Sequence, residues 1–194
     1  MNEVVMNEVA IVGVGLIGGS FALALRGASF TGQITGVSSP GAISDALERR
    51  IIDRALPLEE AAARADLIYL AQPIGRILHT LQHLDQYCRP GTLMTDAGST
   101  KQAIVTAARR FITRAQFLGG HPLAGKELRG AAAADAELFR GRPYVLSPAD
   151  PTDLETPIAS EFLQYLRRMG ARIVVLGAAE HDRLVAASSH VPQL

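Results

Sequence analysis

Three short polar segments carry the residue types that proton transfer and anion binding require: DAGSTKQ at residues 96–102, GGHPLAGK at 119–126 and SSHVP at 188–192. A neutral imidazole at His121 can accept a proton from a substrate hydroxyl near neutral pH. The ammonium group of Lys126 can attract a carboxylate. These residue types indicate acid–base chemistry on a small anionic substrate.

Each segment also has an interpretation that needs no function. Ser99, followed three residues later by Gln102, matches a capping box, which would begin a helix there. His121 stands between Gly and Pro after a predicted strand, so we expect it on a constrained loop, where it either braces a turn or acts as a base. His190 lies at the end of the last predicted helix, where the helix dipole favours a histidine. The residues alone leave both interpretations open.

The other histidines are predicted to be surface residues. His79 and His83 are spaced i, i+4 on a predicted helix, which is the spacing of a metal-binding pair, but no third ligand is near them in the sequence. His181 and Asp182 begin the last predicted helix, and we expect ordinary surface positions for both. No metal site is predicted.

A glycine-rich turn gives the most informative local pattern. Gly13, Gly15 and Gly18 form G-x-G-x-x-G between an apolar run at 9–14 and a helical pattern at 16–27. In this fingerprint the first glycine permits a tight turn, the second lets the backbone approach a pyrophosphate, and the third lets the helix pack close to the strand. The helix N-terminus then offers free N–H groups to the anion. The sequence therefore predicts dinucleotide binding, the alternative being a glycine turn that only packs.

Residues beside this turn complete the predicted cofactor site. Leu16 and Ile17 begin the helix whose N-terminus would face the pyrophosphate. Gln72 and Pro73 end another predicted strand, and in parallel sheets ligands bind at the carboxyl ends of the strands.

The second predicted strand ends in Val-Ser-Ser-Pro at residues 37–40. In many dinucleotide-binding domains this position, about 20 residues after the glycine turn, holds an acidic residue. An Asp or Glu there binds the ribose 2′-hydroxyl and repels a 2′-phosphate. Ser38 and Ser39 repel nothing and can donate to phosphate oxygens. No arginine adjoins them in the sequence, and an alternative is that both simply cap the next helix. We therefore favour NADP over NAD as the cofactor.

The elements that must position these residues alternate along the chain. Apolar runs rich in β-branched residues predict strands, and helical spacing predicts the helices between them. Because the strands are apolar throughout, we predict an α/β fold of the Rossmann type, a doubly wound, mostly parallel sheet with helices on both faces. Strands are expected at 9–14, 33–37, 67–71, 92–95, 116–119, 143–147 and 172–176, and helices at 16–27, 40–50, 56–65 in part, 74–87, 100–111, 154–169 and 178–189.

Composition excludes several function classes. The chain has 194 residues, 48% of them hydrophobic, and its 19 Lys plus Arg balance 19 Asp plus Glu. No net charge attracts nucleic acid or an acidic membrane, so neither is an expected partner. Residues 9–25 carry no charge but are interrupted by glycines and are shorter than the roughly 20 residues of a membrane span. The single cysteine, Cys88, forms no internal disulfide, which fits a cytoplasmic protein.

Six segments of the chain together resemble the prephenate and arogenate dehydrogenase family of tyrosine biosynthesis. They are VAIVGVGLIGGSFALAL, ITGVSS, DLIYLAQP, TLMTDAGSTK, FLGGHPLAGKELRGAAAADAELFRGRPYVLSP and HDRLVAASSHVPQL, in the family's order across residues 8–194. The glycine turn is shared with many dehydrogenases. The D-x-G-S-x-K and G-G-H-P-x-A-G segments are much more specific.

The resemblance implies NAD(P)-dependent oxidative decarboxylation of prephenate or arogenate, a small diacid, to 4-hydroxyphenylpyruvate or tyrosine. It implies that His121 binds the C4 hydroxyl of the substrate and takes up its proton. It further implies that Ser99 orients His121 or the substrate, and that His190 lines the substrate pocket. Lys126 stands where family members often carry a small hydroxyl residue, and we expect it to bind substrate.

The resemblance also implies a domain organisation. Residues 8–178 are expected to be the dinucleotide-binding domain, and residues 179–194 the start of a helix leading to a helical dimerisation domain that is expected to be absent here. Independently of the resemblance, residues 1–7 are expected to be a loose segment, because MNEV at 1–4 recurs at 6–9 and Met6 offers an alternative start. A homodimer is expected only for the full-length protein, and the isolated chain is expected to be poorly active. The alternatives are another β-hydroxyacid-type dehydrogenase, which does not predict the G-G-H-P segment, and a catalytically silent dinucleotide-binding module.

Overall fold

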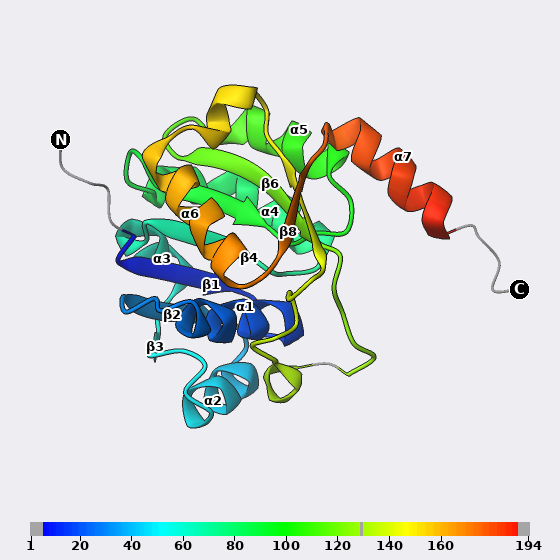
Figure 1. Ribbon diagram of the computed structural model, residues 1–194. Coiled ribbons are helices and arrows are strands. Elements are labelled where there is room, and N and C mark those ends of the chain that lie inside the picture. The colour runs from blue at the N-terminus through cyan, green and yellow to red at the C-terminus, as the bar shows by residue number, and fades with distance from the viewer. Residues whose placement is uncertain (1–5, 129, 190–194) are drawn as a thin grey trace, which may run out of the picture.

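The computed structural model describes residues 6–128 and 130–189, and it shows one sheet with helices on both faces (Figure 1). The sheet has eight strands in the order β3-β2-β1-β4-β5-β6-β7-β8. The strands are β1 (Glu8–Val12), β2 (Gln33–Val37), β3 (Arg54–Ala55), β4 (Leu67–Leu70), β5 (Leu93–Asp96), β6 (Gln116–Pro122), β7 (Pro143–Ser147) and β8 (Arg172–Val175). The α-helices are α1 (Leu16–Gly27), α2 (Pro40–Glu48), α3 (Leu58–Arg64), α4 (Ile74–Leu84), α5 (Gln102–Phe111), α6 (Pro157–Arg168) and α7 (Ala178–Ser189).

The first six strands are parallel, and they follow the strand order 3-2-1-4-5-6 of a doubly wound dinucleotide-binding sheet. The chain moves outward from β1 through β2 to β3, and then returns to the other side of β1 at β4. The crevice beside the carboxyl end of β1 is therefore the topological switch point, where ligands bind in such folds. The predicted Rossmann-type fold is confirmed.

The strands separate two apolar cores, which explains why they are apolar throughout. Val9 and Ile11 of β1 point into the core on the side of α1 and α6. Ala10 and Val12 point into the core on the side of α3, α4 and α5. Because successive side chains of a strand face opposite sides, a strand covered on both faces favours apolar residues at consecutive positions.

Strand β6 continues three residues beyond its predicted end, and this corrects one expectation. His121 lies inside β6 and not on a loop, because β7 returns antiparallel and pairs His121 with Val145 and Pro122 with Tyr144. The pairing of β6 with β5 stops at Leu118. Pro122 is therefore accommodated beyond the part of β6 that is paired on both sides, where its missing N–H breaks no ladder.

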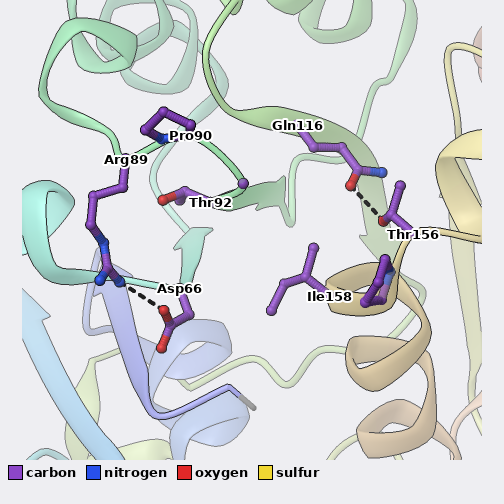
Figure 2. A pocket seen from close by; sticks show the side chains of 9 residues that line it. Asp66, Arg89, Pro90, Thr92, Gln116, Thr156 and Ile158 are labelled. Atoms are coloured by element: carbon purple, nitrogen blue, oxygen red, sulfur yellow. Dashed lines mark hydrogen bonds and ion pairs between the residues drawn. The ribbon is translucent and has the colours of Figure 1, made fainter. Parts of the chain in front are cut away.

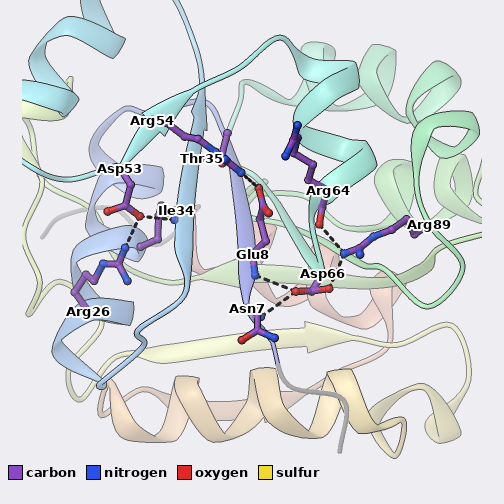
Figure 3. A network of polar contacts seen from close by, with 10 residues as sticks. All are labelled: Asn7, Glu8, Arg26, Ile34, Thr35, Asp53, Arg54, Arg64, Asp66 and Arg89. Carbon is purple, nitrogen blue, oxygen red and sulfur yellow. Dashed lines mark hydrogen bonds and ion pairs between the residues drawn. The ribbon is translucent and has the colours of Figure 1, made fainter. Parts of the chain in front are cut away.

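The amino ends of the strands are held together by a network of polar contacts (Figure 3). The Asp66 carboxylate accepts the backbone N–H groups of Asn7 and Glu8 and forms an ion pair with Arg89 at 2.7 Å. Glu8 forms an ion pair with Arg54 of β3. These contacts join β1, β3 and β4 at the edge of the sheet opposite the glycine turn.

Two residues of the segment 1–7, for which a loose conformation is expected, are described, and both are held in place. Met6 is buried and its N–H donates to Glu161 of α6 at 2.8 Å. The N–H of Asn7 donates to Asp66. Among the helices of the described residues, none has the length and apolar character needed to cross a membrane.

Candidate active site

The glycine turn connects β1 to α1, and its first glycine has a conformation that other residues rarely adopt. Gly13 has a φ of +98°. A Cβ at this position would lie 2.7 Å from the carbonyl oxygen of Ala71, which follows β4. The Gly13 N–H donates to the carbonyl of Val37 at the end of β2. Gly13 therefore allows the chain to turn between β2 and β4 at the switch point.

The other two glycines of the turn differ in what surrounds them. A Cβ at Gly18 would lie 2.2 Å from the carbonyl oxygen of Gly13 and 2.9 Å from Cγ2 of Ile11, so Gly18 lets α1 pack close to β1. Within the described residues, nothing lies within 4 Å of a Cβ at Gly15. The space in front of Gly15 is open, as the approach of a pyrophosphate to the backbone requires.

A groove of about 540 Å³ opens at this point. It brings together six of the predicted cofactor residues: Gly13, Gly15, Ser38, Ser39, Gln72 and Pro73. Three predicted cofactor residues do not line the groove. Gly18 packs α1 against β1, and the side chains of Leu16 and Ile17 are partly buried against the core, so only their backbone can take part in binding. In the described part of the chain, no side chain caps α1 at Gly15. The N-terminus of α1 and the groove together fit the phosphates of a dinucleotide.

Arg76 lines the same groove as Ser38 and Ser39. The sequence patterns did not predict Arg76 as a cofactor residue. It lies in the first turn of α4, 37 residues after Ser39 in the chain. No arginine adjoins Ser38 and Ser39 in the sequence, but β2 and β4 flank β1, so the residues that follow these strands border one groove. The strand order is the only clue that could have indicated Arg76.

His121 is half-buried, and its ring contacts the ring of His181. Nδ1 of His121 lies 2.8 Å from Nε2 of His181, and the rings meet edge to face at 5.0 Å between centroids. Burial lowers the pKa of His121 to about 4, and the neighbouring His181 and Lys101 act in the same direction. The imidazole of His121 is therefore neutral at physiological pH, as a proton acceptor must be.

The expectation that His181 and Asp182 are surface residues was wrong. His181 is only 1% exposed, and its Nδ1 lies 2.8 Å from Oδ1 of Asp182. The Asp182 carboxylate also accepts the N–H groups of Lys101 at 2.7 Å and Gln102 at 3.0 Å. These contacts join α7 to the start of α5, about 80 residues earlier in the chain, so no local pattern reveals them.

These contacts also replace the predicted capping box. Helix α5 has Lys101 as its N-cap residue, and no side-chain cap forms there among the described residues. Asp182 from α7 satisfies the first N–H groups of α5 instead. Ser99 is exposed and follows the carboxyl end of β5. Strand β5 pairs with β6, the strand that contains His121. The serine is thus not used as a helix cap.

A buried ion pair fixes the backbone next to His121. Lys101 and Asp96 are fully buried and paired with each other. Lys101 Nζ donates to the carbonyl of Gly120 at 2.6 Å, and Asp96 accepts the N–H of Gly120 at 3.0 Å. Burial raises the pKa of Asp96 and lowers that of Lys101, so each depends on the other to keep its charge.

The two remaining predicted substrate residues have different outcomes. Lys126 forms an ion pair with Asp135 at 2.7 Å, and both side chains are exposed to about the same extent. Binding of a substrate carboxylate by Lys126 thus competes with Asp135. His190 lies outside the described residues.

A second cavity, of about 370 Å³, lies near the amino ends of the strands (Figure 2). Its polar side chains already pair with one another. Gln116 accepts from the Thr156 hydroxyl at 2.6 Å, and Arg89 pairs with Asp66. Because these polar groups already bind one another, the candidate site is the edge with the glycine turn, Ser99 and His121.

Comparison with known proteins identifies the family of this chain. The model of the family described as prephenate dehydrogenase, nucleotide-binding domain, matches residues 21–175. The chain belongs to this family. Membership in the prephenate dehydrogenase family confirms the resemblance in the sequence and the prediction of a nucleotide-binding domain.

Individual members of the prephenate dehydrogenase family match nearly the whole chain. The prephenate dehydrogenase of Lactococcus lactis subsp. cremoris (strain MG1363) is 36% identical over 192 residues, covering 97% of this chain and 52% of that protein. The crystal structure of Synechocystis arogenate dehydrogenase has a TM-score of 0.84 at 35% identity, covering 94% of this chain and 64% of that chain. Prephenate dehydrogenase from A. aeolicus in complex with hydroxyphenyl propionate and NAD+ has a TM-score of 0.84 at 29% identity, with the same coverage. The chain spans about half the length of the first curated relatives it matches.

Proposed function

We propose that the protein containing this chain catalyses NAD(P)-dependent oxidative decarboxylation of prephenate or arogenate in tyrosine biosynthesis. In this reaction the nicotinamide, when bound, accepts the hydride that leaves C4 of the substrate. The ring carboxylate leaves as CO2 and the ring becomes aromatic, giving 4-hydroxyphenylpyruvate or tyrosine. Family membership and similarity to proteins with these names support the proposal.

The placement of His121 carries the proposal. Its neutral imidazole lies at the carboxyl edge of the sheet that also holds the cofactor groove. There it accepts the proton of the C4 hydroxyl as hydride leaves C4, so no positive charge builds up on that oxygen, and it returns the proton to the phenolate oxygen that forms as CO2 leaves. Ser99, exposed at the end of the neighbouring strand, orients the same hydroxyl or His121. We also propose that Lys126 binds a carboxylate of the substrate and that His190 lines the substrate pocket.

Turnover by the full-length protein tests the role of His121. We expect His121→Asn to lower kcat by about 10²–10⁴-fold, the usual contribution of a general base, while the Kd for the cofactor stays nearly unchanged. His83→Asn, at an exposed histidine of α4, is the matched control and is expected to keep normal turnover. Near-normal turnover of the His121 variant contradicts the assignment. Absence of turnover of both prephenate and arogenate by the native protein contradicts the proposed function.

We further propose that the cofactor is NADP rather than NAD. Ser38 and Ser39 can donate to a 2′-phosphate, and Arg76 adds a positive charge to the same groove. Calorimetric titration of the chain with NADP+ and NAD+ tests this directly. Arg76→Ala is expected to weaken NADP+ binding about tenfold, as the loss of one charged hydrogen bond implies, and to leave NAD+ binding unchanged. Ser38→Asp is expected to shift the preference towards NAD+. Binding of neither dinucleotide rules out the cofactor site.

The domain and partner assignments are also proposals. We propose that residues 8–178 form the dinucleotide-binding domain, that residues 179–194 lead to a helical dimerisation domain, and that the full-length enzyme is a cytoplasmic homodimer. The first curated relatives are about twice as long as this chain, which supports this arrangement. Light scattering coupled to gel filtration tests it: we expect twice the monomer mass for a full-length protein, and a monomeric full-length protein contradicts it.

A further inference from the structure

Helix α7 places two polar side chains, His181 and Asp182, in a hydrogen-bonded row behind His121. Oδ1 of Asp182 lies 2.8 Å from Nδ1 of His181, and Nε2 of His181 lies 2.8 Å from Nδ1 of His121. His181 and Asp182 belong to the first turns of α7, which pack against α5. The later turns of α7 project away from the sheet (Figure 1), and Leu184 on them is 54% exposed. The contact with His121 is thus made where α7 docks.

The direction of each hydrogen bond in this row follows from Asp182. Its carboxylate accepts two backbone N–H groups of α5. Burial alone would raise the pKa of Asp182, but these N–H groups and His181 hold it below its usual value. An ionised carboxylate can only accept, so Nδ1 of His181 must carry the proton of that bond. A neutral His181 then has a bare Nε2, which accepts from Nδ1–H of His121.

A hydrogen bond donated in the opposite direction, from Nε2 of His181 to Nδ1 of His121, requires a charged His181. An imidazolium there would donate from Nε2 to His121, which would place the proton of His121 on Nε2. His181 is almost completely buried, and the ammonium group of Lys101 is close enough to lower the pKa of His121. Two negative charges of the described residues lie near these rings: Asp182, which accepts the N–H groups of Lys101 and Gln102, and Asp96, which Lys101 neutralises. Burying a further cation there is unfavourable.

We propose that His181 and Asp182 are positioning residues that hold His121 as its Nδ1–H tautomer and leave Nε2 free to accept the substrate proton. The hydrogen bond at one ring nitrogen of a histidine determines the state of the other. In serine proteases the buried aspartate acts through the same logic, and its loss leaves the catalytic histidine in the wrong tautomer. The tautomer itself does not depend on the proposed function, whereas its role in turnover rests on it.

Nitrogen-15 NMR of the native chain tests the tautomer without substrate or cofactor. Long-range proton–nitrogen correlation spectra of the imidazole rings show which nitrogen is protonated, and His121→Gln and His181→Gln assign the signals. At pH 7 we expect Nδ1–H and a bare Nε2 for both rings. A His121 ring protonated at Nε2, or a charged His181, overturns the proposal. This measurement stands even if every variant of His181 fails to fold.

Two substitutions at His181 separate positioning from packing. His181→Leu fills the space but removes the acceptor, so we expect His121 to gain the Nε2–H tautomer. His181→Gln keeps an acceptor oxygen, so we expect it to retain the Nδ1–H tautomer. In the full-length enzyme, kcat is expected to fall tenfold or more in the Leu variant, within the contribution of a general base, and to recover in the Gln variant, with KM nearly constant.

The outcomes keep this proposal distinct from the proposed function. The native tautomer with no turnover of prephenate or arogenate by the native enzyme contradicts the function and supports the tautomer assignment. Native turnover in the Leu variant, with its fold shown intact by amide spectra, overturns the positioning role. Equal losses in the Leu and Gln variants also overturn it, because they indicate a packing effect.

Discussion

His121 illustrates how the surroundings of one residue set its chemistry. A free histidine is partly charged near pH 6.5, but at this position burial excludes the water that would stabilise an imidazolium. The positive charge of Lys101 also disfavours the charged form of His121. A neutral ring with a fixed orientation is poised to take a proton without first having to lose one. The same environment makes the stability of the fold depend on pH.

We expect the free energy of unfolding to fall as the pH is lowered from about 6.5 to 4. The pKa of His121 is about 4 in the folded chain and near its ordinary value of 6.5 when unfolded. Between these pH values the unfolded chain binds more protons than the folded chain. The contribution of neutral His121 to the free energy of unfolding is therefore complete above pH 6.5, and it falls by up to about 3 kcal/mol towards pH 4. Urea titrations at several pH values measure this. His121→Gln is expected to flatten the slope, and an unchanged slope contradicts the assignment.

The buried pair of Lys101 and Asp96 leads to a second expectation at this scale. Lys101→Met leaves the Asp96 carboxylate buried without its counter-charge, which should cost about 3–5 kcal/mol. Asp96→Asn combined with Lys101→Met removes both charges and should cost clearly less. Urea unfolding of both variants provides the comparison. Equal losses in the single and double variants indicate that the charge pair is not what stabilises Gly120.

At the scale of the element, two glycines of the glycine turn have different roles: Gly18 is needed for packing of α1, and Gly15 for dinucleotide binding. Gly18→Ala places a methyl group against Gly13 and Ile11, and because the first of these contacts is backbone, α1 must move. We expect a loss of about 1–3 kcal/mol in the free energy of unfolding, as for other overpacked sites. Gly15→Ala meets open space, so we expect a nearly unchanged stability and weaker dinucleotide binding. Thermal unfolding and calorimetry distinguish them, and equal loss of stability in both variants would contradict the division of roles.

Elements with strong local patterns were predictable from the sequence, whereas contacts between distant elements were not. The bounds of α1, β2, β7 and α7 match their predicted ranges, because Gly, Pro or polar residues mark their ends. Strand β6 was too short in the prediction, since its extension depends on the return of β7. Arg76 and His181 reach the site through strand order and helix docking, which local sequence does not encode.

At the scale of the whole molecule, the two edges of the sheet have different tasks. The carboxyl ends of the strands hold the glycine turn, Ser99 and His121, and among the described residues no side chain caps the N-terminus of α1 at this edge. The amino ends carry ion pairs and side-chain caps that are already satisfied within the chain (Figure 3). Parallel strands make this separation possible, because all equivalent ends meet at one edge.

Asp66 tests this division. Its carboxylate binds the N–H groups of Asn7 and Glu8 and pairs with Arg89, at the amino edge of the sheet. Asp66→Ala leaves these donors without acceptors, so we expect a loss of about 2 kcal/mol in the free energy of unfolding, measured with urea. The dinucleotide Kd, measured by calorimetry under conditions where the variant is folded, is expected to stay within about twofold of the native value, because 2 kcal/mol shared by the free and bound states cancels from binding. Arg89→Ala, which removes only the exposed partner, is the matched control and should cost less than about 1 kcal/mol. A Kd that weakens in proportion to stability would show that the two edges of the sheet are coupled.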